Sequence, residues 1–201
     1  MRLSAEVDLV TEDVRNRGPS LFTPVLLVGC VIVLVGFAIR ASFGVFQIPI
    51  EEEFGWPRSE FSLAIAIQNL AWGFGSPFFG AFSEKLGDRK AIVLGAVLYS
   101  LGLVLTAGAS SAFAIQFYEI LVGFGVAGTG FGVILAVVGR ASAPEHRAMS
   151  LAIATASGSA GQIVGPVVAV FLLESGMAVS VSDIRHIYSL GPSTPSIHEG
   201  P

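Results

Sequence analysis

Two charged side chains stand inside long apolar stretches of this 201-residue sequence. Arg40 precedes the end of one stretch at Phe46, and Glu119 follows the start of another at Ala112. With helical geometry, these positions lie about 9 Å and about 10 Å from the ends of their stretches. A charge at that depth is costly and indicates function, unless its side chain extends outward to a polar boundary. An Arg40–Glu119 pair that gates a cavity or exchanges a proton is therefore one hypothesis, and outward extension is the alternative.

Four polar side chains accompany these charges in the apolar stretches: Gln68, Asn69, Gln116 and Tyr118. Amide and phenol groups can donate and accept hydrogen bonds. They suit contact with a small molecule, and they equally suit cross-links between helices. Both interpretations stay open from the sequence alone.

Other kinds of site find little support in the sequence. The histidines and the single cysteine, Cys30, are far apart, so we expect no metal site and no internal disulfide. Residues 123–128 match the Gly-x-Gly-x-x-Gly dinucleotide pattern, but they lie inside an apolar run with no amphipathic helix after it. No nucleophile with a matching base appears. We therefore expect neither enzymatic activity nor a cofactor.

The composition indicates that lipid surrounds most of the chain. Hydrophobic residues make up 53% of the sequence and charged residues 13%. A typical soluble domain has about 25% charged residues, which it needs to cover its surface. The net charge of −4 gives no reason to expect a nucleic-acid partner. The lipid bilayer is the expected partner.

Five apolar stretches are long enough to cross a bilayer, for which a helix needs about 20 residues. They cover residues 25–46, 61–82, 91–109, 112–139 and 148–173. Barrel strands would be about 10 residues long with alternating polarity, so helices are favoured. We expect an all-α membrane protein with a polar tail at 1–20, a transmembrane bundle at 21–175 and a disordered, non-membrane tail at 176–201.

The positive residues predict the orientation of this bundle. One side of the predicted topology carries Arg2, Arg15, Arg17, Lys85, Arg89, Lys90, Arg140 and Arg147. The other side carries only Arg58 and Arg185. We therefore expect a multi-pass protein with a cytoplasmic N-terminus, located in the plasma (inner) membrane.

An internal repeat appears when the sequence is shifted by 88 residues. The shift aligns residues 43–45 with 131–133 and 62–66 with 150–154, and it places Gly73 on Gly161. Five spans arranged this way form inverted units, as in many secondary transporters. The repeat also predicts a sixth span near 179–197, but that window contains charges and prolines and cannot cross a bilayer. The sixth helix is thus expected to be missing, through truncation or as a natural five-span product.

A glycine-bounded charged segment at 80–90 carries the most specific motif. Its residues include Gly80, Glu84, Lys85, Gly87, Asp88 and Arg89. It resembles the signature loop between helices two and three of the major facilitator superfamily, with glutamate in place of the commoner aspartate and Asp88 where a base is usual. The resemblance implies a tight cytoplasmic turn that controls conformational change, with Glu84 and Arg89 as latch residues. The alternative is an ordinary positively charged cytoplasmic loop.

The last span supports the same resemblance. Gly161, Gly165 and Pro166 are similar to the helix-five motif of the superfamily, although Ala169 replaces its final glycine. Small residues spaced by four positions allow two helices to approach closely, and proline bends a helix. Helix packing is the expected role of this motif.

The first hairpin resembles one branch of the superfamily. Residues 40–46 and 53–59 are similar to the monocarboxylate porter and oxalate–formate antiporter-like proteins. The resemblance implies a secondary transporter for a small carboxylate, working by alternating access, of which this chain supplies the N-terminal part. Activity is then expected to need a C-terminal half or self-association. The alternative is a non-transporting truncated protein or assembly partner.

Overall fold

The computed structural model describes residues 21–175, and every regular element in that range is a helix. The elements are α2 (Pro24–Phe54), α3 (Arg58–Leu86), α4 (Asp88–Ala107), α5 (Ala112–Thr129), α6 (Phe131–Ala141) and α7 (Arg147–Glu174). The all-α membrane architecture predicted from the sequence is confirmed. The predicted tails at 1–20 and 176–201, and the 179–197 window, lie outside the described residues.

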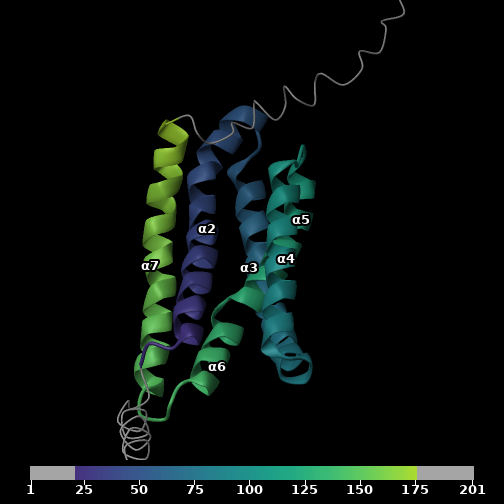
Figure 1. The fold of residues 1–201 in the computed structure, drawn as a ribbon. Coiled ribbons are helices and arrows are strands. Elements are labelled where there is room, and N and C mark those ends of the chain that lie inside the picture. The colour runs from purple at the N-terminus through teal and green to yellow at the C-terminus, as the bar shows by residue number, and fades with distance from the viewer. Residues whose placement is uncertain (1–20, 176–201) are drawn as a thin grey trace, which may run out of the picture.

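The predicted spans correspond to helices of suitable length. Four segments are long and apolar enough to cross a membrane: Pro24–Pro49, Asp88–Ala107, Ala112–Ala141 and Arg147–Glu174. The predicted span 61–82 lies in α3, which has 29 residues but is less apolar because it carries polar side chains such as Gln68 and Asn69. In Figure 1, α3 runs beside α4 and α5 as part of the same bundle.

The fourth predicted span, 112–139, lies within the apolar segment Ala112–Ala141, but the structure divides this segment into two helices. The apolar run breaks at Gly130, whose φ of −87° and ψ of −167° are extended. Its N–H still donates to the carbonyl oxygen of Val126 at 2.7 Å, but the next helix leaves in another direction. Figure 1 shows α6 crossing away from α5 toward the lower end of α2 and α7. An extended glycine therefore divides the span into a long and a short helix.

The bundle contains two parallel helix pairs. A Cβ on Gly161 would collide with the carbonyl oxygen of Leu34, and one on Gly165 would collide with that of Ala38, so α2 and α7 pack closely in one direction. Similarly, a Cβ on Gly123 would lie 2.7 Å from Ala71, which joins α3 and α5. Under the 88-residue shift α2 corresponds to α5 together with α6, and α3 corresponds to α7. The shift thus exchanges the two pairs, as expected for a structural repeat.

Glycines also set the approach of α4 to α5. A Cβ on Gly95 would lie 2.7 Å from the Cα of Gly128, and a Cβ on Gly102 would lie 2.8 Å from the backbone nitrogen of Val122. Small residues permit such contacts between membrane helices. They bring Thr106, one turn after Gly102, close to Glu119, one turn before Gly123. The glycine packing therefore positions the polar residues of the bundle.

Apolar clusters on both sides of α6 complete the core. One cluster joins α2, α6 and α7 through Val33, Phe37, Ile134 and Ala154. The other joins α3, α4, α5 and α6, and its most buried ring is that of Phe79. The short helix α6 therefore connects the α2–α7 pair to the remaining helices.

Candidate functional site

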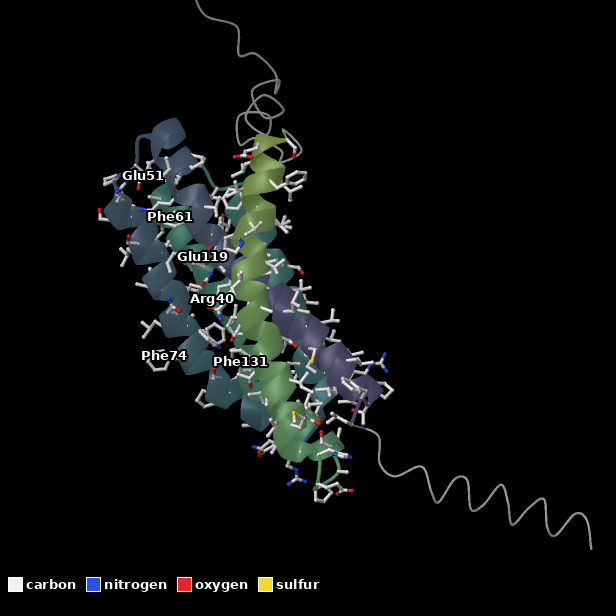
Figure 2. The ribbon with its side chains drawn as sticks, turned by 90° about the vertical axis from the view of Figure 1, so that its left-hand side faces the viewer. Arg40, Glu51, Phe61, Phe74, Glu119 and Phe131 are labelled. Carbon is white, nitrogen blue, oxygen red and sulfur yellow. The ribbon has the colours of Figure 1, made fainter. Side chains whose placement is uncertain are left out.

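Arg40 lies near the middle of α2, between the levels of Phe61 and Phe131 in Figure 2. Its Nη2 donates a short hydrogen bond to the amide oxygen of Asn69 on α3. Its guanidinium also lies 5.2 Å from the ring centroid of Trp72, one helical turn farther along α3. Its Nε is buried and has no hydrogen-bond partner. Among the side chains that the structure describes, Arg40 forms no ion pair, and its charge faces a neutral amide and a ring face.

Trp72 is itself held by aromatic neighbours. Phe37 on α2 meets it edge-on, with ring centroids 5.9 Å apart. Phe37 also stacks on Phe131 of α6 at 4.4 Å. The Trp72 ring that faces the guanidinium is therefore held by contacts among α2, α3 and α6. Its position depends on where α6 begins.

Glu119 is completely buried on α5, with 0% of its surface exposed. One carboxylate oxygen accepts a hydrogen bond from Gln68 Nε2 at 2.6 Å, and the other accepts one from Thr106 Oγ1 at 3.3 Å. Gln68 is 1% exposed, and its Oε1 is buried without a partner. The carboxyl group is thus surrounded by neutral partners from α3 and α4.

The hypothesis of a direct Arg40–Glu119 pair does not match the contacts in the described chain. Arg40 binds Asn69, and Glu119 binds Gln68, so two consecutive residues of α3 separate the charges. Tyr99 of α4 lies between α2 and α5, because its hydroxyl donates to the carbonyl oxygen of Gly36 at 2.8 Å and its ring packs with Val122. We call Arg40, Gln68, Asn69, Trp72, Thr106 and Glu119 the polar cluster.

The other two candidates lie outside the polar cluster. Gln116 Nε2 donates to Glu60 Oε2 at 2.5 Å, a contact that links the starts of α5 and α3. The ring of Tyr118 meets Phe117 edge-on, with centroids 6.2 Å apart, and its hydroxyl has no hydrogen bond to the cluster. Gln116 therefore cross-links helices. Conversely, Trp72 and Thr106 belong to the cluster, although nothing in the sequence distinguished them from other membrane-helix residues.

Residues 28–181 match the family model of the Major Facilitator Superfamily, which covers most of the chain. The chain belongs to this superfamily. It is therefore part of a transporter family, and it is an integral, multi-pass membrane protein.

The alignments with individual relatives cover different shares of this chain. It is 26% identical over 166 residues to "Probable anion transporter 3, chloroplastic" of Arabidopsis thaliana, which is 81% of this chain and 32% of that protein. It is 36% identical over 75 residues to "Monocarboxylate transporter 13" of Bos taurus, 37% of this chain and 18% of that protein. The same protein of Rattus norvegicus is 35% identical over the same length. The chain thus spans a third or less of these relatives.

The signature segment of the superfamily is mostly helical here, so the predicted loop at 80–90 is wrong in its extent. Helix α3 continues through Glu84 and Lys85 to Leu86, and α4 begins at Asp88. Only Gly87 turns the chain, with a φ of 97° that suits glycine. Gly80 lies within α3, and a Cβ there would meet open space. The turn is tighter than a loop because one glycine suffices.

Asp88 makes the polar contacts of this turn. It accepts a short hydrogen bond from Ser83 and a 2.6 Å ion pair from Arg140 Nη2. Asp88 is the first residue of α4, and Arg140 lies in the last turn of α6. Each charge therefore also interacts favourably with the dipole of its own helix. Within the described residues, Glu84 and Arg89 form no side-chain hydrogen bond or ion pair. No described contact supports the latch role of Glu84 and Arg89 that the resemblance implies. Asp88, in contrast, connects α6 to the turn between α3 and α4 through its ion pair with Arg140.

The helix-five motif contacts the first membrane helix. Gly161 and Gly165 face the backbone of α2 at Leu34 and Ala38, as described above, while Pro166 follows inside α7. The predicted packing role of the two glycines agrees with these contacts.

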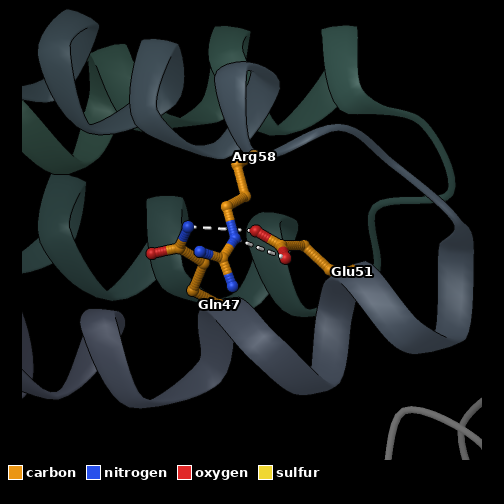
Figure 3. A network of polar contacts seen from close by, with 3 residues as sticks. All are labelled: Gln47, Glu51 and Arg58. Carbon is orange, nitrogen blue, oxygen red and sulfur yellow. Dashed lines mark hydrogen bonds and ion pairs between the residues drawn. The ribbon is translucent and has the colours of Figure 1, made fainter.

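At the end of the bundle opposite the signature turn, a second polar network joins α2 to α3 (Figure 3). Glu51 accepts a hydrogen bond from Gln47 Nε2 at 3.0 Å and an ion pair from Arg58 Nε at 3.0 Å. The hydrogen bond from Gln47 lowers the pKa of Glu51, and the bond and charge of Arg58 lower it further against the effect of partial burial. The network therefore favours the ionised carboxylate.

This network predicts a pH-dependent contribution to stability. Because the folded-state pKa of Glu51 is below its ordinary value of 4.5, the contribution is complete above pH 4.5 and is lost as pH falls through the folded-state pKa. We expect the melting-temperature difference between wild type and Glu51→Gln in detergent to be constant above that value and to disappear at lower pH. Gln47→Leu should reduce the difference. A difference that grows on acidification contradicts the assignment.

Proposed function

We propose that this chain forms part of a secondary transporter that binds a small organic anion, such as a carboxylate, at Arg40. The observation that supports the proposal is a guanidinium inside a predicted membrane span that has no acidic partner among the described side chains, and whose Nε has no hydrogen-bond partner among them. Charged groups away from water are stabilised by a counter-charge and by complete hydrogen bonding. An anion supplies the counter-charge, and a carboxylate fits the planar donor fork of arginine.

The relatives support an anionic substrate. The printed names of two of them refer to an anion transporter and a monocarboxylate transporter. The chain covers only 32% and 18% of those proteins, so a complete transport cycle is proposed for an assembly that contains this chain. Its partner is a C-terminal transporter half or a second copy, which together with this bundle would alternate between two sides of the membrane.

The distribution of positive charge supports one orientation. The signature turn, the end of α6 and the start of α7 lie at one end of the bundle and carry Lys85, Arg89, Lys90, Arg140 and Arg147. The positive-inside rule places that end in the cytoplasm. We propose a cytoplasmic N-terminus and location in the plasma (inner) membrane.

Trp72 offers a direct test of anion binding because it lies against Arg40, and Trp56 is the other tryptophan in the sequence. We expect acetate to change the fluorescence of the purified Trp56→Phe chain. Arg40→Gln should weaken this response by about ten- to a hundredfold, the effect of losing hydrogen bonds to a charged group. The control Arg58→Gln removes a cation that lies 72% exposed at the bundle end, and it should leave the response unchanged. An equal response in all three variants contradicts the proposed site.

A second candidate, which the sequence leaves open, is a non-transporting membrane protein or assembly partner. Vesicle uptake separates the two functions. For a transporter part, acetate uptake is expected when this chain is combined with its partner half, and it should be lost in Arg40→Gln. Uptake that never exceeds that of empty vesicles in any combination favours the second candidate.

A further inference from the structure

Tyr99 of α4 carries a phenol group into the interior of the bundle. Its side chain is 6% exposed, and its ring forms an apolar cluster with Val122 and Val126 of α5, which we call the Tyr99 cluster. Its hydroxyl reaches α2 and donates a hydrogen bond to the carbonyl oxygen of Gly36 at 2.8 Å. A phenylalanine ring would fill the same apolar space, so the hydroxyl and its contact with α2 have a separate role.

The accepting carbonyl group connects Tyr99 to Arg40. In an α-helix, the carbonyl oxygen of one residue accepts a hydrogen bond from the N–H four residues later. Within α2, the carbonyl oxygen of Gly36 therefore accepts from the backbone N–H of Arg40 as well as from the Tyr99 hydroxyl. A carbonyl oxygen has two lone pairs and can accept both bonds. One shared oxygen atom thus joins the phenol to the backbone of Arg40.

The Tyr99 cluster also contacts the neighbours of the guanidinium. Ile39, which directly precedes Arg40, packs against this cluster, and so does Trp72 of α3. Trp72 presents its ring to the guanidinium, which also donates to Asn69. The cluster therefore supports both the segment of α2 that carries Arg40 and the ring that the guanidinium faces.

The position of Tyr99 is itself closely determined by α5. A Cβ on Gly125 would collide with the backbone of Tyr99, and a Cβ on Gly95, one turn earlier, would lie 2.7 Å from the Cα of Gly128. The approach to α2 is looser, because a Cβ on Gly36 would lie at an ordinary distance of 3.8 Å from Cε1 of Tyr99. At this level, the hydroxyl bond rather than close packing fixes α2 relative to α4.

We propose that Tyr99 is a positioning residue for anion binding: its hydroxyl holds the turn of α2 that carries Arg40 and directs the guanidinium toward Asn69 and Trp72. The inference rests on the proposed anion site and adds to it a residue that does not touch the anion. Without the hydroxyl, Gly36 keeps its helical hydrogen bond, so α2 stays helical but is free to turn at this level. The donors of Arg40 then meet a bound carboxylate less often.

The binding test measures acetate affinity through Trp72 fluorescence in the purified Trp56→Phe chain. Tyr99→Phe should weaken acetate binding by about three- to tenfold, the effect of one hydrogen bond between neutral groups. The matched control is Tyr118→Phe, which removes the same hydroxyl from a tyrosine of α5 outside the polar cluster and should leave the affinity unchanged. Para-aminophenylalanine in place of Tyr99 returns a donor to the same ring position and should restore the affinity.

Nuclear magnetic resonance of ¹⁵N-labelled arginine side chains provides a readout that needs no anion. The Nε signal of Arg40 is assigned by its loss in Arg40→Gln. It should shift in Tyr99→Phe and return to its wild-type position with para-aminophenylalanine. The Nε signal of Arg140, which is paired with Asp88 at the end of the bundle, should stay constant in all of these variants.

Ordinary packing is the alternative role of Tyr99, and the two measurements separate it from positioning. If Tyr99→Phe lowers the melting temperature but leaves the Arg40 signal and the acetate affinity unchanged, the inference is overturned. An affinity that para-aminophenylalanine does not restore, in a chain that melts like wild type, also overturns it. If wild type never binds acetate, the anion site fails, while the Arg40 signal still decides whether Tyr99 positions the guanidinium.

Discussion

Replacing Gly161 with alanine is expected to destabilise the protein, whereas the same change at Gly73 is expected to be neutral or stabilising. These glycines are equivalent under the 88-residue shift, and both lie inside long helices. A Cβ at Gly161 would collide with the carbonyl oxygen of Leu34, and backbone cannot move aside as a side chain can. A Cβ at Gly73 would have no neighbour within 4 Å.

The expected sizes follow from these surroundings. Overpacking of a tight contact costs about 1–3 kcal/mol, so Gly161→Ala should lower the melting temperature of the purified chain in detergent. Gly73→Ala should gain up to about 1 kcal/mol from the higher helix propensity of alanine. Gly165→Ala faces the carbonyl oxygen of Ala38 and should behave like Gly161→Ala. Equal melting temperatures for Gly161→Ala and Gly73→Ala would show that α2 and α7 do not pack as described.

This contrast also shows how far a repeat in the sequence predicts contacts. The shift correctly relates the α2–α7 pair to the α3–α5 pair, because apolar length and spacing are preserved between the two units. It does not predict which glycine makes the contact. In the second pair, Gly75 and Gly123 approach the neighbouring helix in place of Gly73. A small rotation of a helix moves the contact to another residue without changing the pattern of the sequence.

The sequence predicts only some members of the polar cluster, because it does not show which residues of neighbouring helices face one another. Arg40, Gln68, Asn69 and Glu119 are recognisable because polar groups are rare in apolar helices. Their partners are not, because consecutive residues on a helix point about 100° apart, and the register between helices decides which one meets which charge. Trp72 and Thr106 have no distinguishing feature in a membrane helix. Only the packing of α3 and α4 against α5 brings them to the charges.

Local geometry explains why the helix bounds differ from the prediction in two segments. The charges at 80–90 suggested a loop, but Asp88 at the start of α4 and Lys85 in the last turn of α3 complement the helix dipoles, so both helices extend to Gly87. The run at 112–139 suggested one helix, since a glycine among many others gives no sign of a break. The break becomes visible only where Phe131 stacks on Phe37 and directs α6 toward α2.

Replacing Gly130 with alanine is expected to disturb both stability and anion binding. A Cβ there would lie 2.6 Å from the carbonyl oxygen of Val126 and 3.7 Å from Nε1 of Trp72. The first contact is too close, so the start of α6 must shift, and Phe131 moves with it. Because Phe131 stacks on Phe37, and Phe37 meets Trp72, the shift reaches the ring that faces Arg40.

We expect Gly130→Ala to lose about 1–3 kcal/mol of stability, the usual effect of overpacking. In the Trp56→Phe background it should also change the emission of Trp72 and weaken the acetate response. Gly132→Ala is the matched control, because it lies two residues later and a Cβ there has no neighbour within 4 Å. If Gly130→Ala keeps both the wild-type emission and the wild-type acetate affinity, the position of α6 does not determine the geometry at Arg40, and the aromatic contacts from Phe131 to Trp72 are only packing.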